Sequence, residues 1–113
     1  MKIAIAATGN TMESQVDRRF ARALKFILVD TDTGAFEAHD NSANMNAAHG
    51  AGTQAAALVS QLGAQAVIAG DCGPKALSAL QAAGIQVYVN FKGTVAEAVD
   101  AFRAGRLTPA HSP

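Results

Sequence analysis

The sequence predicts an α/β domain in which helices pack on a mostly parallel β-sheet. Two observations lead to this class. In the second half of the chain, short apolar runs alternate with segments whose apolar residues recur at helical spacing, which is the pattern of β-α-β units. In the first half, two strand-like runs are joined by turn residues, which adds an antiparallel hairpin. At 113 residues, about 65% of the unfolded surface is buried on folding, which is enough for one core.

Three strands are expected before the first long helix. Residues 2–8 form a buried strand with isoleucines on one face and alanines on the other. Residues 25–31 have a continuous apolar centre, and the following Asp32-Thr33-Gly34 supplies the residues of a tight turn. Residues 34–40 then alternate in polarity, as an edge strand does. We therefore expect the second and third strands to form a hairpin.

The rest of the chain alternates helices with strands, in the order helix 55–62, strand 66–70, helix 74–83, strand 85–89 and helix 95–104. Glycines mark the helix ends, while Pro74 and a capping box of Thr94 with Glu97 mark two of the starts. The predicted fold is a five-stranded sheet with three helices, β-β-β-α-β-α-β-α. Residues 1–107 form this single domain, and residues 108–113 are expected to be a flexible tail.

Composition excludes several functional classes. Nine Lys and Arg balance nine Asp and Glu, so the neutral chain has no long-range field that would collect nucleic acid or anionic lipid. A single cysteine forms no internal disulfide and supplies no four-thiolate zinc or iron–sulfur cage. The apolar run at the N-terminus is too short to span a bilayer and shows no signal-peptide cleavage pattern. We expect a cytoplasmic monomer with neither a nucleic-acid nor a membrane partner.

In sheets of this kind, ligands bind beyond the carboxyl ends of the parallel strands, where loops and helix N-termini converge. This rule selects the loops that follow Thr8, Gly70 and Val89, together with the approach to the first long helix. Candidate site residues are therefore sought in these segments.

The first of these loops contains Thr8, Gly9, Asn10 and Met12, and the pair Arg18 and Arg19 follows it. With Arg22, the pair places three of the nine basic residues within five positions. One interpretation is an anion-binding cluster. The other is a set of solvated charges paired with Asp17, with Phe20 in the core.

The approach to the first long helix ends in His49, Gly50 and Gly52. Glycines there let the backbone approach a ligand, and free N–H groups at a helix start attract anions. His49 is either a ligand or an ordinary surface histidine. Met45 is a candidate soft contact, although a gap-filling methionine is more usual at such a position.

The loop after the fourth strand carries Asp71, Cys72 and Gly73 just before a helix N-terminus. This position favours the thiolate form of a cysteine. The alternative is a buried, inert thiol between strand and helix. One thiol with one or two histidines makes a poor metal cage, but it can contact a cofactor that is already assembled.

Enzyme motifs are missing from the sequence. It contains no phosphate-binding loop, no dinucleotide fingerprint and no nucleophile elbow. Cys72, His49 and Asp71 could act as nucleophile, base and orienter, but the sequence does not place them within hydrogen-bond reach. We assign no role to His39 or His111.

Several short motifs follow one another along the chain in a characteristic order. They are Met1-Lys2-Ile3-Ala4-Ile5, residues 16–20, Gly50-Ala51-Gly52, Val67-Ile68-Ala69-Gly70, Gly73-Pro74-Lys75-Ala76, residues 83–88 and Gly93-Thr94-Val95. In this order and spacing, over residues 1–107, the chain resembles the dinitrogenase iron–molybdenum cofactor biosynthesis family. The resemblance implies a ribonuclease H-like fold with sheet order 3-2-1-4-5 and an antiparallel second strand. It also implies binding of metal–sulfur clusters or cofactor precursors without a closed cage, and a close relative in sulfate-reducing bacteria carries a mixed molybdenum–copper sulfide cluster. Cys72 departs from the family, in which an aliphatic residue is more usual.

The sequence and this resemblance lead to one interpretation, a non-catalytic carrier. Its cargo is a preformed, anionic, molybdenum-containing metal–sulfide cluster, either molybdenum–copper sulfide or a precursor of the iron–molybdenum cofactor, bound non-covalently. Arg18 and Arg19 neutralise charge, and backbone N–H groups donate to sulfur at Gly9, Gly50, Gly52 and Gly73. The remaining candidate contacts are Thr8, Asn10, Met12, Met45, His49, Asp71 and Cys72.

A carrier of this kind implies a cofactor-assembly or acceptor protein as its partner. Two other functions stay open. One is a small hydrolase or transferase that uses Cys72 or Asp71 with His49. The other is a cofactor-free protein-interaction module.

Overall fold

The structure, a computed structural model, describes residues 1–45 and 49–110, although the side chain of Met45 is not among the described parts. His111, for which no role was expected, lies outside the described residues. The described chain forms six strands and four helices, in the order β1 (Lys2–Ala7), β2 (Lys25–Asp30), β3 (Phe36–Asp40), α1 (Ser42–Met45), α2 (Ala51–Gln61), β4 (Ala66–Ile68), α3 (Pro74–Ala82), β5 (Gln86–Val89), α4 (Val95–Arg103) and β6 (Thr108–Pro109).

All described strands belong to one mixed sheet, with the order β3-β2-β1-β4-β5-β6. β1 pairs with β4 and β4 with β5 in parallel, while β2 runs antiparallel to both β1 and β3. The predicted order of the first five strands and the antiparallel second strand are therefore confirmed. The hairpin is also confirmed, and its turn is closed by the Gly34 N–H, which donates to the Asp30 carbonyl at 2.8 Å.

The prediction of five strands and three helices is wrong at two places in the described chain. Ser42–Met45 forms the short helix α1, and Thr108–Pro109, which was assigned to the tail, forms β6 beside β5. The Ala110 N–H extends this contact by donating to the Val87 carbonyl at 2.8 Å. A proline is tolerated in β6 because an edge strand can leave one backbone position without a donor.

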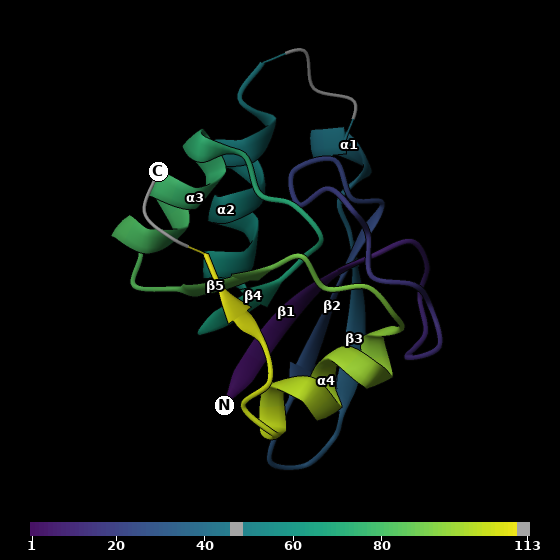
Figure 1. The fold of residues 1–113 in the computed structure, drawn as a ribbon. Coiled ribbons are helices and arrows are strands. Elements are labelled where there is room, and N and C mark those ends of the chain that lie inside the picture. Colours follow the sequence, from purple (N-terminus) through teal and green to yellow (C-terminus); the bar gives the residue numbers. More distant parts are fainter. Residues whose placement is uncertain (46–48, 111–113) are drawn as a thin grey trace.

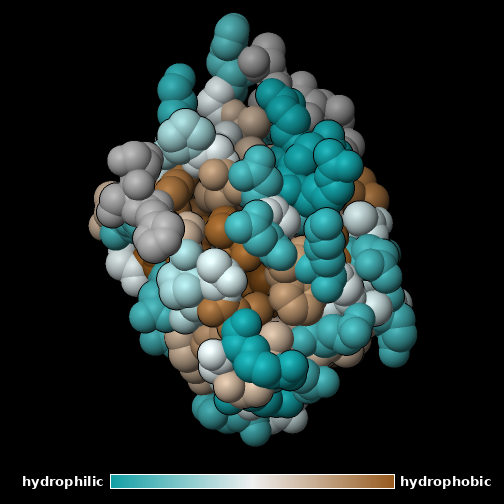
Figure 2. All heavy atoms as spheres, viewed as in Figure 1, coloured by the Kyte–Doolittle hydropathy of each residue, from teal (hydrophilic) through white to brown (hydrophobic). Residues whose placement is uncertain are grey.

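Helices cover both faces of the sheet (Figure 1). On one face, α2 and α3 pack over Ala4 and Ala6 of β1, and on the other, α4 packs over Ile3 and Ile5. This follows from the alternation of side chains along a strand, as the sequence predicted. In Figure 2, hydrophilic side chains predominate on the visible face and hydrophobic ones show mainly in a central recess. The hydrophobic core therefore forms two layers, one on each face of the sheet.

At α3 and α4, the predicted helix boundaries rest on local chemistry that the structure confirms, whereas α2 begins at Ala51, four residues before the predicted start. Thr94 Oγ1 accepts a hydrogen bond from the Glu97 N–H at 3.1 Å, and Glu97 Oε1 accepts one from the Thr94 N–H at 2.9 Å, which completes the capping box of α4. Gly84 follows α3 with a φ of 77°, the left-handed conformation expected of a residue that ends a helix.

None of the described helices has the length and apolarity needed to cross a bilayer.

Candidate functional site

The loop between β1 and β2 folds back over the carboxyl ends of three strands (Figure 1). The Asp17 N–H donates to the Ala6 carbonyl at the end of β1 at 2.7 Å. The Asp17 carbonyl accepts the Gly70 N–H after β4 at 3.0 Å, and the Val16 N–H donates to the Gly93 carbonyl after β5 at 2.8 Å. The loop is therefore held by backbone hydrogen bonds to each strand end that the sequence selected.

Gly70 lets this loop lie directly on the end of β4. A Cβ at this position would be 2.7 Å from Arg18 Cα and 3.0 Å from the Arg18 carbonyl oxygen. Real Cβ atoms do not approach backbone atoms so closely, so only glycine permits the observed contact. The Phe20 N–H, which donates to the Asp71 carbonyl at 2.9 Å, fixes the other end of the segment. The backbone of Arg18 and Arg19 is thus anchored on both sides.

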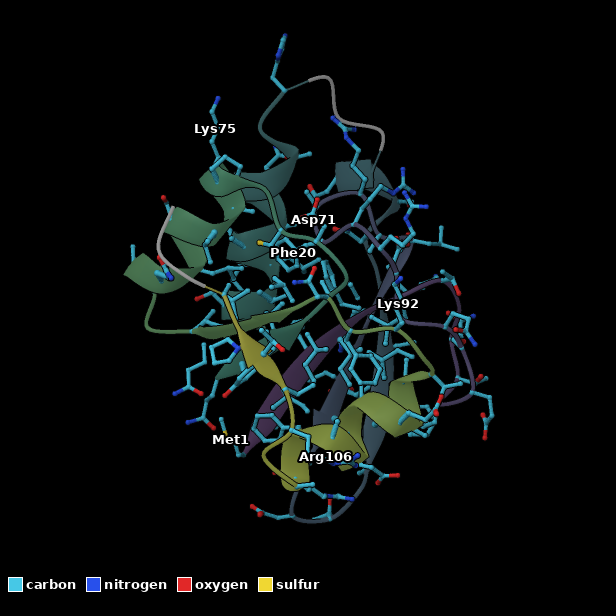
Figure 3. All side chains as sticks on the ribbon, viewed as in Figure 1. Met1, Phe20, Asp71, Lys75, Lys92 and Arg106 are labelled. Atoms are coloured by element: carbon cyan, nitrogen blue, oxygen red, sulfur yellow. The ribbon has the colours of Figure 1, made fainter. Side chains whose placement is uncertain are left out.

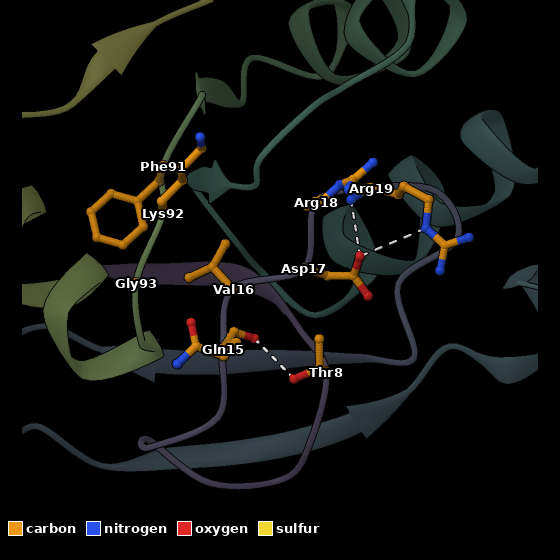
Figure 4. Close-up of a pocket in the computed structure, with 9 residues that line it drawn as sticks. All are labelled: Thr8, Gln15, Val16, Asp17, Arg18, Arg19, Phe91, Lys92 and Gly93. Carbon is orange, nitrogen blue, oxygen red and sulfur yellow. Dashed lines mark hydrogen bonds and ion pairs between the residues drawn. The ribbon is translucent and has the colours of Figure 1, made fainter.

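A pocket of about 600 Å³ opens beside this segment (Figure 4). We call it the arginine pocket, and its lining residues are Thr8, Gln15, Val16, Asp17, Arg18, Arg19, Phe91, Lys92 and Gly93. Arg19 is held by the nearly buried Asp17, because Asp17 Oδ1 accepts the Arg19 N–H at 2.9 Å and lies 3.8 Å from Arg19 Nε. The Thr8 hydroxyl donates to the Gln15 carbonyl at 3.3 Å.

Arg18 and Lys92 differ from Arg19 in their contacts with neighbouring side chains. Within the described part of the chain, neither side chain has an ion pair or hydrogen bond. Both also line an adjoining pocket of about 290 Å³, whose lining residues are Arg18, Gly70, Asp71, Asn90, Phe91 and Lys92. The sequence rule had selected the loop after Val89 but singled out no residue in it, because a lone lysine after a strand carries no motif.

A second group of predicted residues surrounds a different hollow, of about 340 Å³, between the N-terminal ends of α2 and α3. We call it the helix-terminus hollow, and its lining residues are Ala21, Arg22, His49, Gly50, Ala51, Gly52, Thr53, Gly73, Pro74, Lys75 and Ala76. It shares no lining residue with the arginine pocket. In the view of Figure 3, Lys75 and Lys92 lie on opposite sides of Asp71. The predicted contacts are therefore divided between two places.

The glycines of the helix-terminus hollow have structural tasks of their own. Gly50 precedes α2 with a φ of 74°, a left-handed conformation that favours glycine. A Cβ at Gly52 would lie 3.1 Å from Ala76 Cβ, so its small size lets α2 approach α3 closely. Gly73 differs, since no atom lies within 4 Å of a Cβ built there and its φ is −63°. Neither helix start has a side-chain cap.

Three further predicted residues, Gly9, Asn10 and Met12, line neither cavity. Met12 packs against the core beneath α4, and Gly9 lies against Ser14 within its own loop. Asn10 is exposed. The side chain of Met45 lies outside the described parts of the structure. Met12 thus has a packing role in the hydrophobic core.

The environment of Cys72 determines the protonation state of this residue. Burial, followed by the charge of Asp71, raises the pKa of its thiol from 9.0 to about 11. Of the two interpretations of Cys72, the structure therefore supports the buried, protonated thiol over the thiolate, because burial and the neighbouring carboxylate both disfavour the charged form. The sulfur packs against the core under α2 and α3.

The described residues contain no group of three His, Cys, Asp or Glu side chains placed to hold a metal ion. What the arrangement offers instead is charge and shape. Arg18, Arg19 and Lys92 stand against the two carboxylates of Asp17 and Asp71 around the arginine pocket and its neighbour. A neutral protein thus presents a locally cationic crevice where its strands end.

Fold and site together define a small α/β protein with a cationic crevice at the carboxyl edge of its sheet. Residues 1–105 match the family model described as dinitrogenase iron-molybdenum cofactor. The chain therefore belongs to this family, and the predicted family resemblance is confirmed.

Three relatives are similar along nearly the whole chain. An uncharacterized protein of Methanocaldococcus jannaschii is 34% identical over 110 residues, which cover 95% of this chain and 89% of the relative. The apo form of the orange protein from Desulfovibrio gigas is 42% identical with a TM-score of 0.96, covering 99% of this chain and 94% of that one. A NifB-like protein from Thermotoga is 38% identical with a TM-score of 0.84, covering 99% and 97%.

Proposed function

We propose that this protein is a non-catalytic carrier of a preformed, anionic, molybdenum-containing metal–sulfide cluster, held non-covalently in the arginine pocket. The observation that carries the proposal is the position of Arg18 and Arg19. Both line a pocket of about 600 Å³ at the carboxyl ends of the parallel strands, in a protein whose net charge is zero. Membership of an iron–molybdenum cofactor family supports a cargo of this chemistry.

The pocket suits retention by charge rather than by covalent bonds. Guanidinium groups are weakly hydrated and planar, which favours contact with a soft anion. Cys72 is a poor ligand in comparison, because its raised pKa keeps the thiol protonated near neutral pH. A cargo held by charge and N–H donors can be handed to a cofactor-assembly or acceptor protein without breaking a metal–ligand bond.

The helix-terminus hollow is the alternative location for the same cargo. The unpaired backbone N–H groups at a helix N-terminus attract anions, and two such N-termini, those of α2 and α3, meet at this hollow. His49 also lines the hollow. We place the cargo in the arginine pocket because Gly50 and Gly52 already have structural explanations, whereas the side chain of Arg18 has none within the described chain.

A hydrolase or transferase built from Cys72, Asp71 and His49 is disfavoured by two observations. Asp71 lines the pocket beside Arg18, whereas His49 lines the helix-terminus hollow. Cys72 lines neither and has a raised pKa, opposite to the shift that activates a nucleophile. These observations support a carrier over an enzyme.

The finer features of the proposal follow the same family reasoning. We propose a molybdenum–copper sulfide or an iron–molybdenum cofactor precursor as the cargo, a ribonuclease H-like class for the fold, and a cytoplasmic monomer as the working state. Metal analysis and the absorption spectrum of protein purified anaerobically from its native host identify the cargo directly. A colourless, metal-free preparation would instead favour a protein-interaction module.

The electrostatic part is tested with the double variant Arg18→Ala, Arg19→Ala. Anaerobic titration of the apoprotein with tetrathiomolybdate, followed by visible absorption, is expected to show an affinity lowered roughly 30-fold or more, since two cations near the anion are lost. The matched control is Arg106→Ala, which removes an exposed cation that lines neither cavity. Equal affinities in the double variant and the control would contradict the proposal.

A further inference from the structure

We infer that Lys92 is a further binding residue of the arginine pocket, and that with Arg18 and Phe91 it selects a soft thioanion over an oxyanion of the same charge. This inference rests on the proposed function and deepens it. Lys92 comes from the loop between β5 and α4, whereas Arg18 comes from the loop between β1 and β2 (Figure 4). Two segments distant in sequence thus supply cations to one cavity.

The backbone on both sides of Lys92 is fixed. The Asn90 N–H donates to the Gly70 carbonyl at 2.8 Å, and Asn90 itself has a φ of 63°, a left-handed conformation that asparagine tolerates better than most residues. On the other side, the Gly93 carbonyl accepts the Val16 N–H at 2.8 Å. The Cα of Lys92 is thereby held at the rim, and only its side chain remains to be oriented by a ligand.

The charges around Lys92 leave it available. Asp17 Oδ1 already accepts the Arg19 N–H at 2.9 Å, and Asp71 Oδ1 accepts the Cys72 N–H at 2.9 Å. No ion pair joins either carboxylate to Lys92 or Arg18 within the described chain. Lys92 and Arg18 therefore stand on the shared border of two pockets as cations that form no ion pair within the described chain.

The preference for a thioanion follows from how the hydrogen-bond donors are distributed around the pocket, because the charged donors belong to Arg18, Arg19 and Lys92 while Phe91 offers none from its side chain. The N–H groups of Val16, Asp17 and Arg19 are already bonded within the protein. Phe91, which packs against the core beneath α4, adds an apolar wall. On the side that faces Phe91, a strongly hydrated oxyanion would lose water contacts that the aromatic ring does not replace, whereas sulfur ligands are weakly hydrated and polarizable. Lys92 and Arg18 supply the charge, and Phe91 supplies a surface that penalises the oxyanion.

Competition between tetrathiomolybdate and molybdate on the anaerobic apoprotein tests this inference. For the unmodified protein we expect tetrathiomolybdate to bind at least tenfold more tightly than molybdate. Lys92→Ala is expected to weaken tetrathiomolybdate binding about tenfold and to reduce its salt dependence, while Lys92→Arg retains most of the affinity. Phe91→Ala is expected to narrow the preference between the two anions, provided that its unfolding midpoint shows a folded protein.

Lys75→Ala provides the matched comparison, because Lys75 lines the helix-terminus hollow and not the arginine pocket. If Lys75→Ala weakens binding and Lys92→Ala does not, the inference about Lys92 fails while the carrier function stands. Equal affinity for the two anions in the unmodified protein overturns the selectivity. If the unmodified protein binds neither anion, it is the proposed function that fails.

Discussion

The arginine pocket and the helix-terminus hollow lie at the same edge of the sheet but are built by different means. The first is assembled from loops that meet only through long-range backbone hydrogen bonds, such as those of Asp17 to Ala6 and Gly70. The second is formed by two helix starts, each specified by its own local sequence. In the first, the charge is carried by Arg18, Arg19 and Lys92, while the second combines Arg22 and Lys75 with the backbone N–H groups of two helix starts.

This difference determines how each cavity is expected to respond to mutation. Side-chain charges can be removed without moving the backbone, so the arginine pocket can lose its ligand affinity while the protein stays folded. Backbone donors can be altered only by changing the residues that shape the helix starts. The two locations for the cargo are therefore separable by experiment, and the following predictions are chosen to separate them.

The largest effect is expected from Gly70→Ala. The added Cβ would lie 2.7 Å from Arg18 Cα, so the loop must leave the end of β4. We expect a loss of about 3 kcal/mol in the free energy of unfolding, together with a loss of tetrathiomolybdate affinity. Denaturant unfolding and the anaerobic titration measure the two effects. A stable variant with full affinity would show that this close contact does not build the arginine pocket.

The second prediction concerns Cys72, which lies in the sequence between Asp71 of the adjoining pocket and Gly73 of the helix-terminus hollow. With its pKa raised from 9.0 to about 11, the thiolate fraction below pH 9.0 is about one-hundredth of that in the unfolded chain. Iodoacetamide is therefore expected to modify the native protein at least a hundredfold more slowly than the urea-unfolded protein, with Cys72→Ser as the control for other reactive groups.

The same shift predicts a direction for stability against pH. The folded state favours the protonated thiol, so its contribution is fully present below pH 9.0 and is lost as the pH rises from 9.0 to about 11. Cys72→Ser is expected to show a smaller fall in stability across this interval. Equal native and unfolded alkylation rates, or identical pH profiles, would contradict burial as the cause.

The smallest effect is expected from Gly73→Ala. A Cβ at Gly73 meets no atom within 4 Å, and its φ of −63° suits any residue. We expect the free energy of unfolding to change by no more than about 1 kcal/mol, the range of helix N-cap substitutions. With the cargo in the arginine pocket, tetrathiomolybdate affinity should stay within about twofold. A clear loss of affinity in this folded variant would move the cargo to the helix-terminus hollow.

The parts of the site that the sequence predicted are those with a local signal. Arg18 and Arg19 are conspicuous as a cluster of charge, and Pro74 and Thr94 mark helix starts that the structure confirms. Lys92 was missed because its importance depends on Arg18, which is 74 positions away in the sequence and joins it only through the sheet. For a related reason, the sequence did not show that Met12, in a polar loop, packs against the core beneath α4.

By itself, the sequence determined the order of the helices and strands other than α1 and β6, the alternation that buries alanines on one face of β1 and isoleucines on the other, and the family. These properties are local or periodic. Because buried residues must be apolar, the spacing of apolar residues along the chain predicts which segments are helices and which are strands. Tertiary structure alone decided that Gly70 supports Arg18, that Cys72 is a protonated thiol, and that the candidate contacts divide between two cavities. Such properties depend on desolvation and on contacts between distant segments, which exist only once the sheet has brought the strand ends together.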